Sequence, residues 1–140
     1  MARIGRRIAF DYGDVRIGVA ICDPDGILAT PIATLQSKDP GLKSEIAKLL
    51  SEYEPIKAYV GNPKLLSGRD GEAVAKVLAF TEFLTANFDL PIVLVDERLS
   101  TVTAARQLRE SGVDSKGAKS LIDAAAAVAI LEQGLANESK

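Results

Sequence analysis

The sequence contains no histidine and only one cysteine, Cys22, among its 140 residues. Without histidine, acid–base catalysis by imidazole and zinc sites with histidine ligands are excluded. A single cysteine can form neither an internal disulfide nor a cysteine-rich metal site, so we expect a reducing, cytoplasmic environment. Any chemistry must therefore depend on carboxylates, lysine, arginine, hydroxyl groups and a cation that prefers oxygen ligands.

Long hydrophobic runs are missing as well. No apolar stretch reaches the length of about 18 residues that indicates a membrane-spanning helix. The basic segment 1–7 leads into a β pattern rather than into the apolar region of a signal peptide. The hydrophobic fraction of 47% is sufficient for a core. We expect one domain over residues 1–140 that does not enter a membrane.

A strongly basic composition is absent too. The net charge is -2, whereas nucleic-acid-binding domains usually carry a basic surface. Basic residues are nevertheless concentrated in two segments, namely Arg3, Arg6, Arg7 and Arg16, and then Arg98, Arg106, Arg109, Lys116 and Lys119. Because charged runs are more often solvated surface than binding sites, composition alone leaves nucleic-acid binding open.

Hydrophobic periodicity predicts strands and helices in a mixed order. Strands are expected at residues 3–11, 16–22, 27–35, 58–60 and 92–95, and helices at residues 42–53, 72–88, 101–110 and from 115 or 116 to about 134. Pro31 indicates an edge position for the third strand, and the continuous apolar run 92–95 is typical of a strand buried on both faces. Three hairpin-joined strands followed by strand–helix alternation predict an α/β fold with a mixed sheet and helices on both faces.

Acidic residues follow two of the predicted strands, at the edge where α/β sheets bind ligands. Asp11 closes the first strand, and Asp96 and Glu97 follow the strand at 92–95. A carboxylate at the end of a buried strand is costly to desolvate unless a partner such as a metal ion is present. The alternative for Asp11 is a turn cap. Side-chain alternation places Asp96 and Glu97 on opposite faces, so only one of them is expected to join Asp11.

Asp123 lies in an alanine-rich part of the last predicted helix. Small residues would let this helix approach the sheet closely and bring Asp123 over the strand ends, whereas the alternative is a surface pair with Lys119 one turn earlier. Three or four carboxylates from separate elements suit Mg²⁺. Two such ions can activate a water and stabilise the leaving oxygen in phosphodiester cleavage.

The loop 61–71 contains three glycines and precedes a helix. It could offer backbone N–H groups, Lys64 or Arg69 to a phosphate. The loop lacks the Walker A pattern, and simple turn geometry is the other explanation of its glycines.

Four motifs occur in order along the chain: Asp11-Tyr12-Gly13 with Arg16-Ile17-Gly18-Val19-Ala20, Val60-Gly61-Asn62-Pro63 with Gly68 and Gly71, Asp96-Glu97-Arg98-Leu99-Ser100-Thr101, and Ile122-Asp123 with Ala126-Ala127. Together they resemble the YqgF family of Holliday-junction-resolvase-like, pre-16S rRNA-processing nucleases, over about residues 7–131. The resemblance implies a ribonuclease-H-like fold, with a five-stranded mixed sheet in the order 3-2-1-4-5 and helices on both faces.

By this resemblance Asp11, Glu97 and Asp123 are the catalytic, metal-binding acids, with Asp96 as a nearby second candidate. The implied cofactor is Mg²⁺ or Mn²⁺, as two ions, and the implied partner is nucleic acid, either precursor rRNA or branched DNA. The expected substrate contacts are Arg16, Asn62, Lys64, Arg69 and Arg98. Asn62 and the stretch 65–68 depart from the usual family pattern, in which a leucine and an Asn-Met-Asp-Gly-like sequence stand there. The oligomeric state is left as monomer or homodimer.

Two other functions remain compatible with the sequence. The strand-Asp-x-Gly hairpin also occurs in actin-like and sugar-kinase ATPases, but those enzymes need two lobes to enclose a nucleotide, and 140 residues supply one. A non-catalytic nucleic-acid-binding module could keep the same fold, because fold and motif do not prove turnover.

Overall fold

The computed structural model describes residues 4–62, 71–96 and 116–138, and within the last range it describes side chains from residue 125 onward. In these ranges five strands form one mixed sheet in the order β3-β2-β1-β4-β5, as predicted. The strands are β1 (Arg7–Tyr12), β2 (Arg16–Cys22), β3 (Ala29–Gln36), β4 (Lys57–Asn62) and β5 (Ile92–Asp96). The helices are α1 (Leu42–Tyr53), α2 (Gly71–Asn87) and α4 (Lys116–Glu138).

The sheet combines an antiparallel and a parallel half. β1 pairs antiparallel with β2, and β2 pairs antiparallel with β3. β1 and β5 both pair parallel with β4, which lies between them. β3 is an edge strand, which confirms the position that Pro31 indicated.

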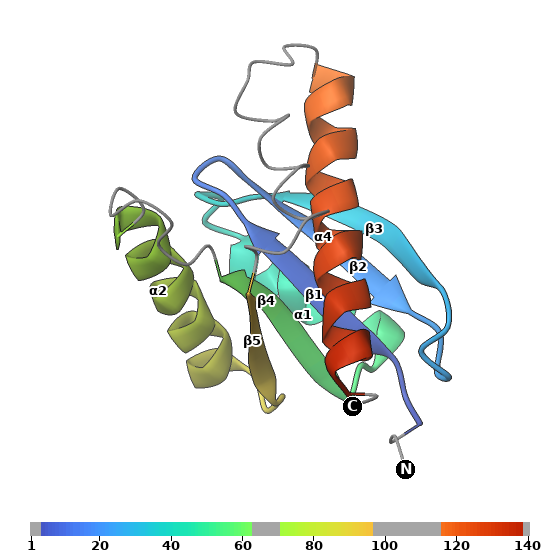
Figure 1. The fold of residues 1–140 in the computed structure, drawn as a ribbon. Helices are drawn as coiled ribbons and strands as arrows, with labels where there is room; N and C mark the ends of the chain where they lie inside the picture. Colours follow the sequence, from blue (N-terminus) through green and yellow to red (C-terminus); the bar gives the residue numbers. More distant parts are fainter. Residues whose placement is uncertain (1–3, 63–70, 97–115, 139–140) are drawn as a thin grey trace.

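Helices cover both faces of the sheet, with α4 on one face and α1 and α2 on the other (Figure 1). Ile8 and Phe10 of β1 point into the core beneath α1 and α2, whereas Ala9 points into the core beneath α4. This alternation assigns every other β1 residue to the α4 face. Among the helices described here, none is long and apolar enough to cross a membrane.

Several predicted boundaries are wrong at the strand ends. Gly61 and Asn62 were expected in a loop, but they belong to β4 because they pair with Val95 and Asp96 of β5. β1 begins at Arg7 rather than at residue 3, and β3 spans Ala29–Gln36 rather than residues 27–35. The predicted helix at 101–110 lies outside the described residues.

Two expectations about burial are also corrected. β5 is an edge strand rather than a fully covered one, and Val93 and Leu94 are 40% and 38% exposed. The helical spacing of residues 72–88 predicts Leu78 on the inner face of α2, but Leu78 is 42% exposed, whereas Phe80 is buried and packs against Phe10 and Tyr12. The aromatic contacts with β1 therefore set the rotation of α2 about its axis.

Gly134 does not end the last helix as predicted, since α4 continues to Glu138. Its lack of a side chain serves packing instead. A Cβ at this position would lie 2.7 Å from ring atoms of Tyr59, which is 1% exposed and cannot move aside. Glycine thus lets α4 approach β4 closely.

We expect Gly134→Ala to destabilise the protein, although the same change inside a helix normally stabilises by about 1 kcal/mol. Overpacking against a buried ring costs about 1–3 kcal/mol, so the net loss should be about 1 kcal/mol, measured by urea unfolding. Gly71→Ala is the matched control, because a Cβ there meets nothing within 4 Å. Equal stability of the two variants would contradict the packing role.

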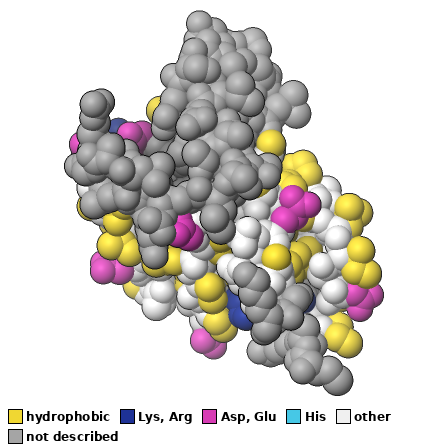
Figure 2. Space-filling model, viewed as in Figure 1, with side chains coloured by type: hydrophobic (Ala, Val, Ile, Leu, Met, Phe, Trp, Pro, Cys, Tyr) yellow, Lys and Arg dark blue, Asp and Glu magenta, His cyan; other side chains and the backbone are white. Residues whose placement is uncertain are grey.

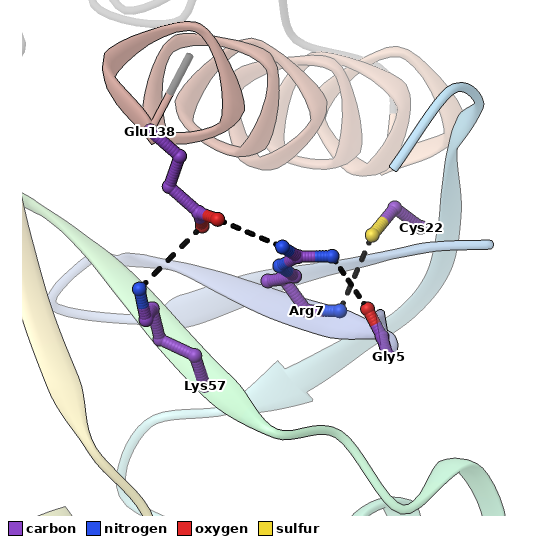
Figure 3. Close-up of polar contacts among 5 residues, drawn as sticks. All are labelled: Gly5, Arg7, Cys22, Lys57 and Glu138. Atoms are coloured by element: carbon purple, nitrogen blue, oxygen red, sulfur yellow. Dashed lines mark hydrogen bonds and ion pairs between the residues drawn. The ribbon is translucent and has the colours of Figure 1, made fainter. Parts of the chain in front are cut away.

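A buried ion pair fixes the C-terminal end of α4 to the sheet (Figure 3). Arg7 is 3% exposed, and its Nη2 donates to Glu138 Oε1 at 2.7 Å while its Nη1 donates to the Gly5 carbonyl at 2.7 Å. Lys57 Nζ lies 3.6 Å from Glu138 Oε2. The backbone N–H of Arg7 also donates to Cys22 Sγ at 3.2 Å. Burial raises the pKa of the Cys22 thiol, so it remains protonated and is no nucleophile.

Candidate active site

Asp11 is a fully buried carboxylate at the carboxyl end of β1. Its side chain is 0% exposed. Asp11 follows Ala9 by two residues and therefore lies on the α4 face of the sheet. The strand order places β1 at the centre of the sheet, between β2 and β4. The predicted strand-end position is confirmed, and the burial of Asp11 is greater than a turn cap requires.

Glycines occupy the neighbouring positions on both sides of Asp11. In the antiparallel ladder Asp11 pairs directly with Gly18 of β2. In the parallel ladder Phe10 pairs with Val60, so Gly61 is the next residue of β4 and lies beside Asp11 on the α4 face. Across β2, β1 and β4, the Asp11 carboxylate is thus the only long side chain of its row.

Asp96 lies on the other face of the sheet. It follows Val95, whose side chain packs in the core beneath α4, and it shares its face with Ile92, which packs against the α1–α2 side. Asp96 pairs with Asn62 in the β4–β5 ladder. The sequence offered Asp96 and Glu97 as partners of Asp11, and the structure places Asp96 on the face opposite to Asp11. Glu97 lies outside the described residues.

Helix α4 includes position 123, although the side chain of Asp123 is not among those described. Four residues later, Ala127 packs against the sheet, followed one turn on by Ile130 and Leu131. These three residues are each 0% exposed. In Figure 1 the N-terminal turns of α4 extend beyond the sheet at the end where β1 passes into β2. Position 123 is thus on the helix that covers the Asp11 face.

The predicted substrate-binding residues are only partly described. Arg16 begins β2 and is half-buried. Asn62 ends β4, is 9% exposed and lies on the face opposite to Asp11, so its side chain is less open than a substrate contact would suggest. Lys64, Arg69 and Arg98 lie outside the described residues. Figure 2 shows few Lys or Arg side chains on the described surface of this face.

One charged contact near the site was not predicted. Lys76 Nζ of α2 lies 2.8 Å from Asp14 Oδ1 in the β1–β2 turn and 3.3 Å from Glu72 Oε1. The hydrogen bond from Lys76 lowers the pKa of Asp14, and the bonds to Asp14 and then Glu72 raise the pKa of Lys76. Ser37 Oγ donates to the Gly13 carbonyl at 2.5 Å. These contacts hold the turn that follows Asp11. Only the Glu72–Lys76 spacing was visible in the sequence.

The described residues contain no group of three or more His, Cys, Asp or Glu side chains that could hold a metal ion. Two of the three predicted ligands, Glu97 and Asp123, have no described side chain. The fit to a cation therefore depends on Asp11. Asp11 supplies an oxygen ligand of the kind that Mg²⁺ and Mn²⁺ prefer, and its neighbours in the row, Gly18 and Gly61, carry no side chain that could compete for the cation.

Two solved structures with a similar fold are of RuvC from Thermus thermophilus. One, in complex with a Holliday junction substrate, is 17% identical, with a TM-score of 0.59 and coverage of 96% of both chains. The other is 12% identical, with a TM-score of 0.57 and the same coverage. This likeness confirms the predicted ribonuclease-H-like fold.

Sequence relatives match almost the whole chain. A protein of Streptomyces coelicolor named "Putative pre-16S rRNA nuclease" is 54% identical over 138 residues, covering 97% of this chain and 83% of the relative. A protein of Rhodococcus opacus with the same name is 49% identical over 142 residues, covering 97% and 80%. The family model described as "RuvX: Holliday junction resolvase" matches residues 5–137. The chain belongs to this RuvX family, the one that its four motifs resemble under the name YqgF.

Proposed function

We propose that this protein is a divalent-metal-dependent nuclease that cuts structured nucleic acid, with the 5′ end of precursor 16S rRNA as its substrate. The observation that carries the proposal is Asp11, a 0% exposed carboxylate at the carboxyl end of the central strand β1. The relatives named "Putative pre-16S rRNA nuclease" support the choice of substrate. A ribosomal precursor as substrate places the activity in the cytoplasm.

The proposed ligands of the cation are Asp11, Glu97 and Asp123. Side chains alternate between the two faces along β5, and Asp96 lies on the face opposite to Asp11. If the same alternation continued by one residue, position 97 would lie on the face of Asp11. Position 123 precedes Ala127 by one helical turn on the helix that covers this face. Two Mg²⁺ or Mn²⁺ ions held by such carboxylates would supply an activated water and stabilise the leaving oxygen.

The protein's own residues would orient this chemistry. The burial of Asp11 holds its carboxylate in one direction and keeps bulk water away, which strengthens its electrostatic interactions. Arg16, Lys64, Arg69 and Arg98 would hold backbone phosphates, with Asn62 near the same edge. Attack of water on phosphorus then breaks one phosphorus–oxygen bond, and the departing oxygen takes up a proton.

A four-way DNA junction is the second candidate substrate, and it is favoured by the family description "Holliday junction resolvase". Paired cuts in a junction would require two active sites related by a two-fold axis. We therefore expect a homodimer if junctions are cut, whereas a monomer suffices for one cut in a precursor RNA.

Cleavage assays with the purified protein test the proposal directly. A precursor 16S rRNA fragment and a synthetic four-way junction are incubated separately with Mg²⁺, Mn²⁺ or EDTA. We expect cleavage of the RNA with either metal and none with EDTA. Binding without cleavage under every metal would favour the non-catalytic module, and ATP hydrolysis without cleavage would favour the kinase-like lobe.

A further inference from the structure

A cavity of about 320 Å³ lies between the ends of α1 and α2, and six residues line it: Leu50, Pro55, Asn87, Phe88, Asp89 and Leu90. They belong to the two segments that lead from α1 into β4 and from α2 into β5 (Figure 1). The parallel strands begin at this end of the sheet, whereas Asp11 lies at the carboxyl end of β1. The cavity is therefore separate from the proposed cleavage site.

The lining of the cavity is mostly apolar and is continuous with the core. Leu50, Phe88 and Leu90 are half-buried and pack against the core beneath α1 and α2. Phe88 also meets the ring of Phe83 edge-on, with the ring centroids 6.5 Å apart. These contacts hold the lining side chains in place, so a ligand would find an apolar wall that is already formed.

Negative charge gathers around this apolar lining. The last carbonyl groups of a helix have no partner within the helix and carry a partial negative charge. Neither α1 nor α2 has a basic residue in its last turn. Asp89 lines the cavity, and Glu54 precedes the lining residue Pro55. Within the part of the chain that the structure describes, no basic side chain forms an ion pair with either carboxylate.

Glu54 is unfavourable for stability in two ways. It ends α1 in the left-handed conformation with a φ of 49°, and it is the one described residue other than glycine with a positive φ. Glycine is the usual residue at such a helix end, because it has no Cβ. A negative charge there also opposes the partial charge of the helix C-terminus. A strained residue of this kind points to a function, and what Glu54 adds here is a carboxylate.

We propose that this cavity binds an arginine side chain of a basic protein partner. The stem of an arginine would cover the apolar lining, and its planar guanidinium matches a carboxylate such as Asp89 and stacks on a ring such as Phe88. Asn87 and Asp89 are exposed, so the cavity opens on the surface, where an arginine of a docked protein can act as an anchor. Nucleic acid is an unsuitable occupant, because the carboxylates and the two helix ends would repel its phosphates.

An arginine peptide is the probe that tests this proposal. Acetyl-Gly-Arg-Gly-amide is added to the nitrogen-15-labelled full chain, and the amide signals are followed by NMR. We expect saturable shifts for Leu50 and residues 87–90, with a dissociation constant on the order of 1 mM for this single anchor. The same peptide with citrulline has nearly the same shape without the charge and should cause no saturable shift. A lysine peptide should bind several-fold more weakly, because it lacks the planar guanidinium.

Three variants of the chain locate the binding. Asp89→Asn should weaken binding of the arginine peptide by about 5-fold, because a charge-assisted pair is lost. Asp25→Asn is the matched control, since it removes the same charge from an exposed position in the β2–β3 turn and should leave binding unchanged. Glu54→Gly should weaken binding by about 2-fold. It should also raise the melting temperature by a few degrees, because glycine relieves the left-handed backbone.

Several results would overturn the proposal. The first is the absence of saturable shifts at the cavity residues. Equal binding of the citrulline peptide would show that charge plays no part, and equal weakening by Asp89→Asn and Asp25→Asn would reduce the effect to the overall negative charge. If spermidine binds at the same residues more tightly than the arginine peptide, the occupant is a free polyamine rather than a protein. A lower melting temperature of Glu54→Gly would show that Glu54 serves the helix end instead.

Discussion

Asp11→Asn is expected to abolish metal-dependent cleavage while the metal-free protein still folds. An amide is a neutral and weak metal ligand, and loss of several kcal/mol of transition-state stabilisation lowers the rate by about 10³-fold or more. Asn has nearly the shape of Asp and keeps one oxygen acceptor, so the packing around this 0% exposed side chain should be retained. Cleavage rates and melting temperatures of both proteins, with and without Mn²⁺, check this expectation.

Metal should also stabilise only the parent. A ligand that binds only the folded state stabilises it by RT ln(1 + [L]/Kd), so the melting temperature rises with the logarithm of the ligand concentration above the dissociation constant. We therefore expect Mn²⁺ to raise the melting temperature of the parent and to leave that of Asp11→Asn unchanged. Equal cleavage by the two proteins would show that the carboxylate of Asp11 takes no part in the reaction.

Asp96→Asn is the matched control for this variant. It makes the same chemical change at the end of β5, which is separated from β1 by β4, and on the opposite face of the sheet. Cleavage close to that of the parent is expected. A loss as large as that of Asp11→Asn would mean that both acids hold metal, and the argument from strand alternation would be wrong.

The sequence predicted the position of Asp11 because it is encoded locally. An apolar run, an acid and a Tyr-Gly turn occur together, and the hairpin partner follows within a few residues. Alternation along β5 also predicted that Asp96 and Glu97 would not both join Asp11, and Asp96 does lie on the face opposite to Asp11. The strand order, by contrast, came from the family resemblance rather than from periodicity.

The roles of two glycines could not be predicted from local sequence. Gly61 and Gly134 were interpreted as loop and helix-end signals, since glycine is common in both. Their actual surroundings are a neighbouring strand and the ring of Tyr59, and both lie far away in the chain. The contact between Arg7 and Glu138 spans 131 residues, so no spacing rule could have revealed it.

Glu138→Ala is expected to cause a large loss of stability at the end of the sheet opposite to Asp11. Arg7 is 3% exposed, so its charge cannot be solvated when its partner is removed. Breaking a buried ion pair from one side costs about 3 kcal/mol, which corresponds to a fall of roughly 10 °C in melting temperature. Thermal and urea unfolding of the variant measure both quantities.

Lys57→Met is the control that distinguishes the buried Arg7–Glu138 pair from the more exposed Lys57–Glu138 pair. Lys57 is 31% exposed and its Nζ lies 3.6 Å from Glu138, so its removal should cost less than about 1 kcal/mol. The double variant Arg7→Met/Glu138→Leu should recover much of the stability lost in Glu138→Ala, because apolar side chains need no counter-charge. If Glu138→Ala is no less stable than Lys57→Met, solvent reaches Arg7 and the pair does not hold α4 on the sheet. If the double variant recovers nothing, the Glu138 side chain stabilises the helix end by its packing rather than by its charge.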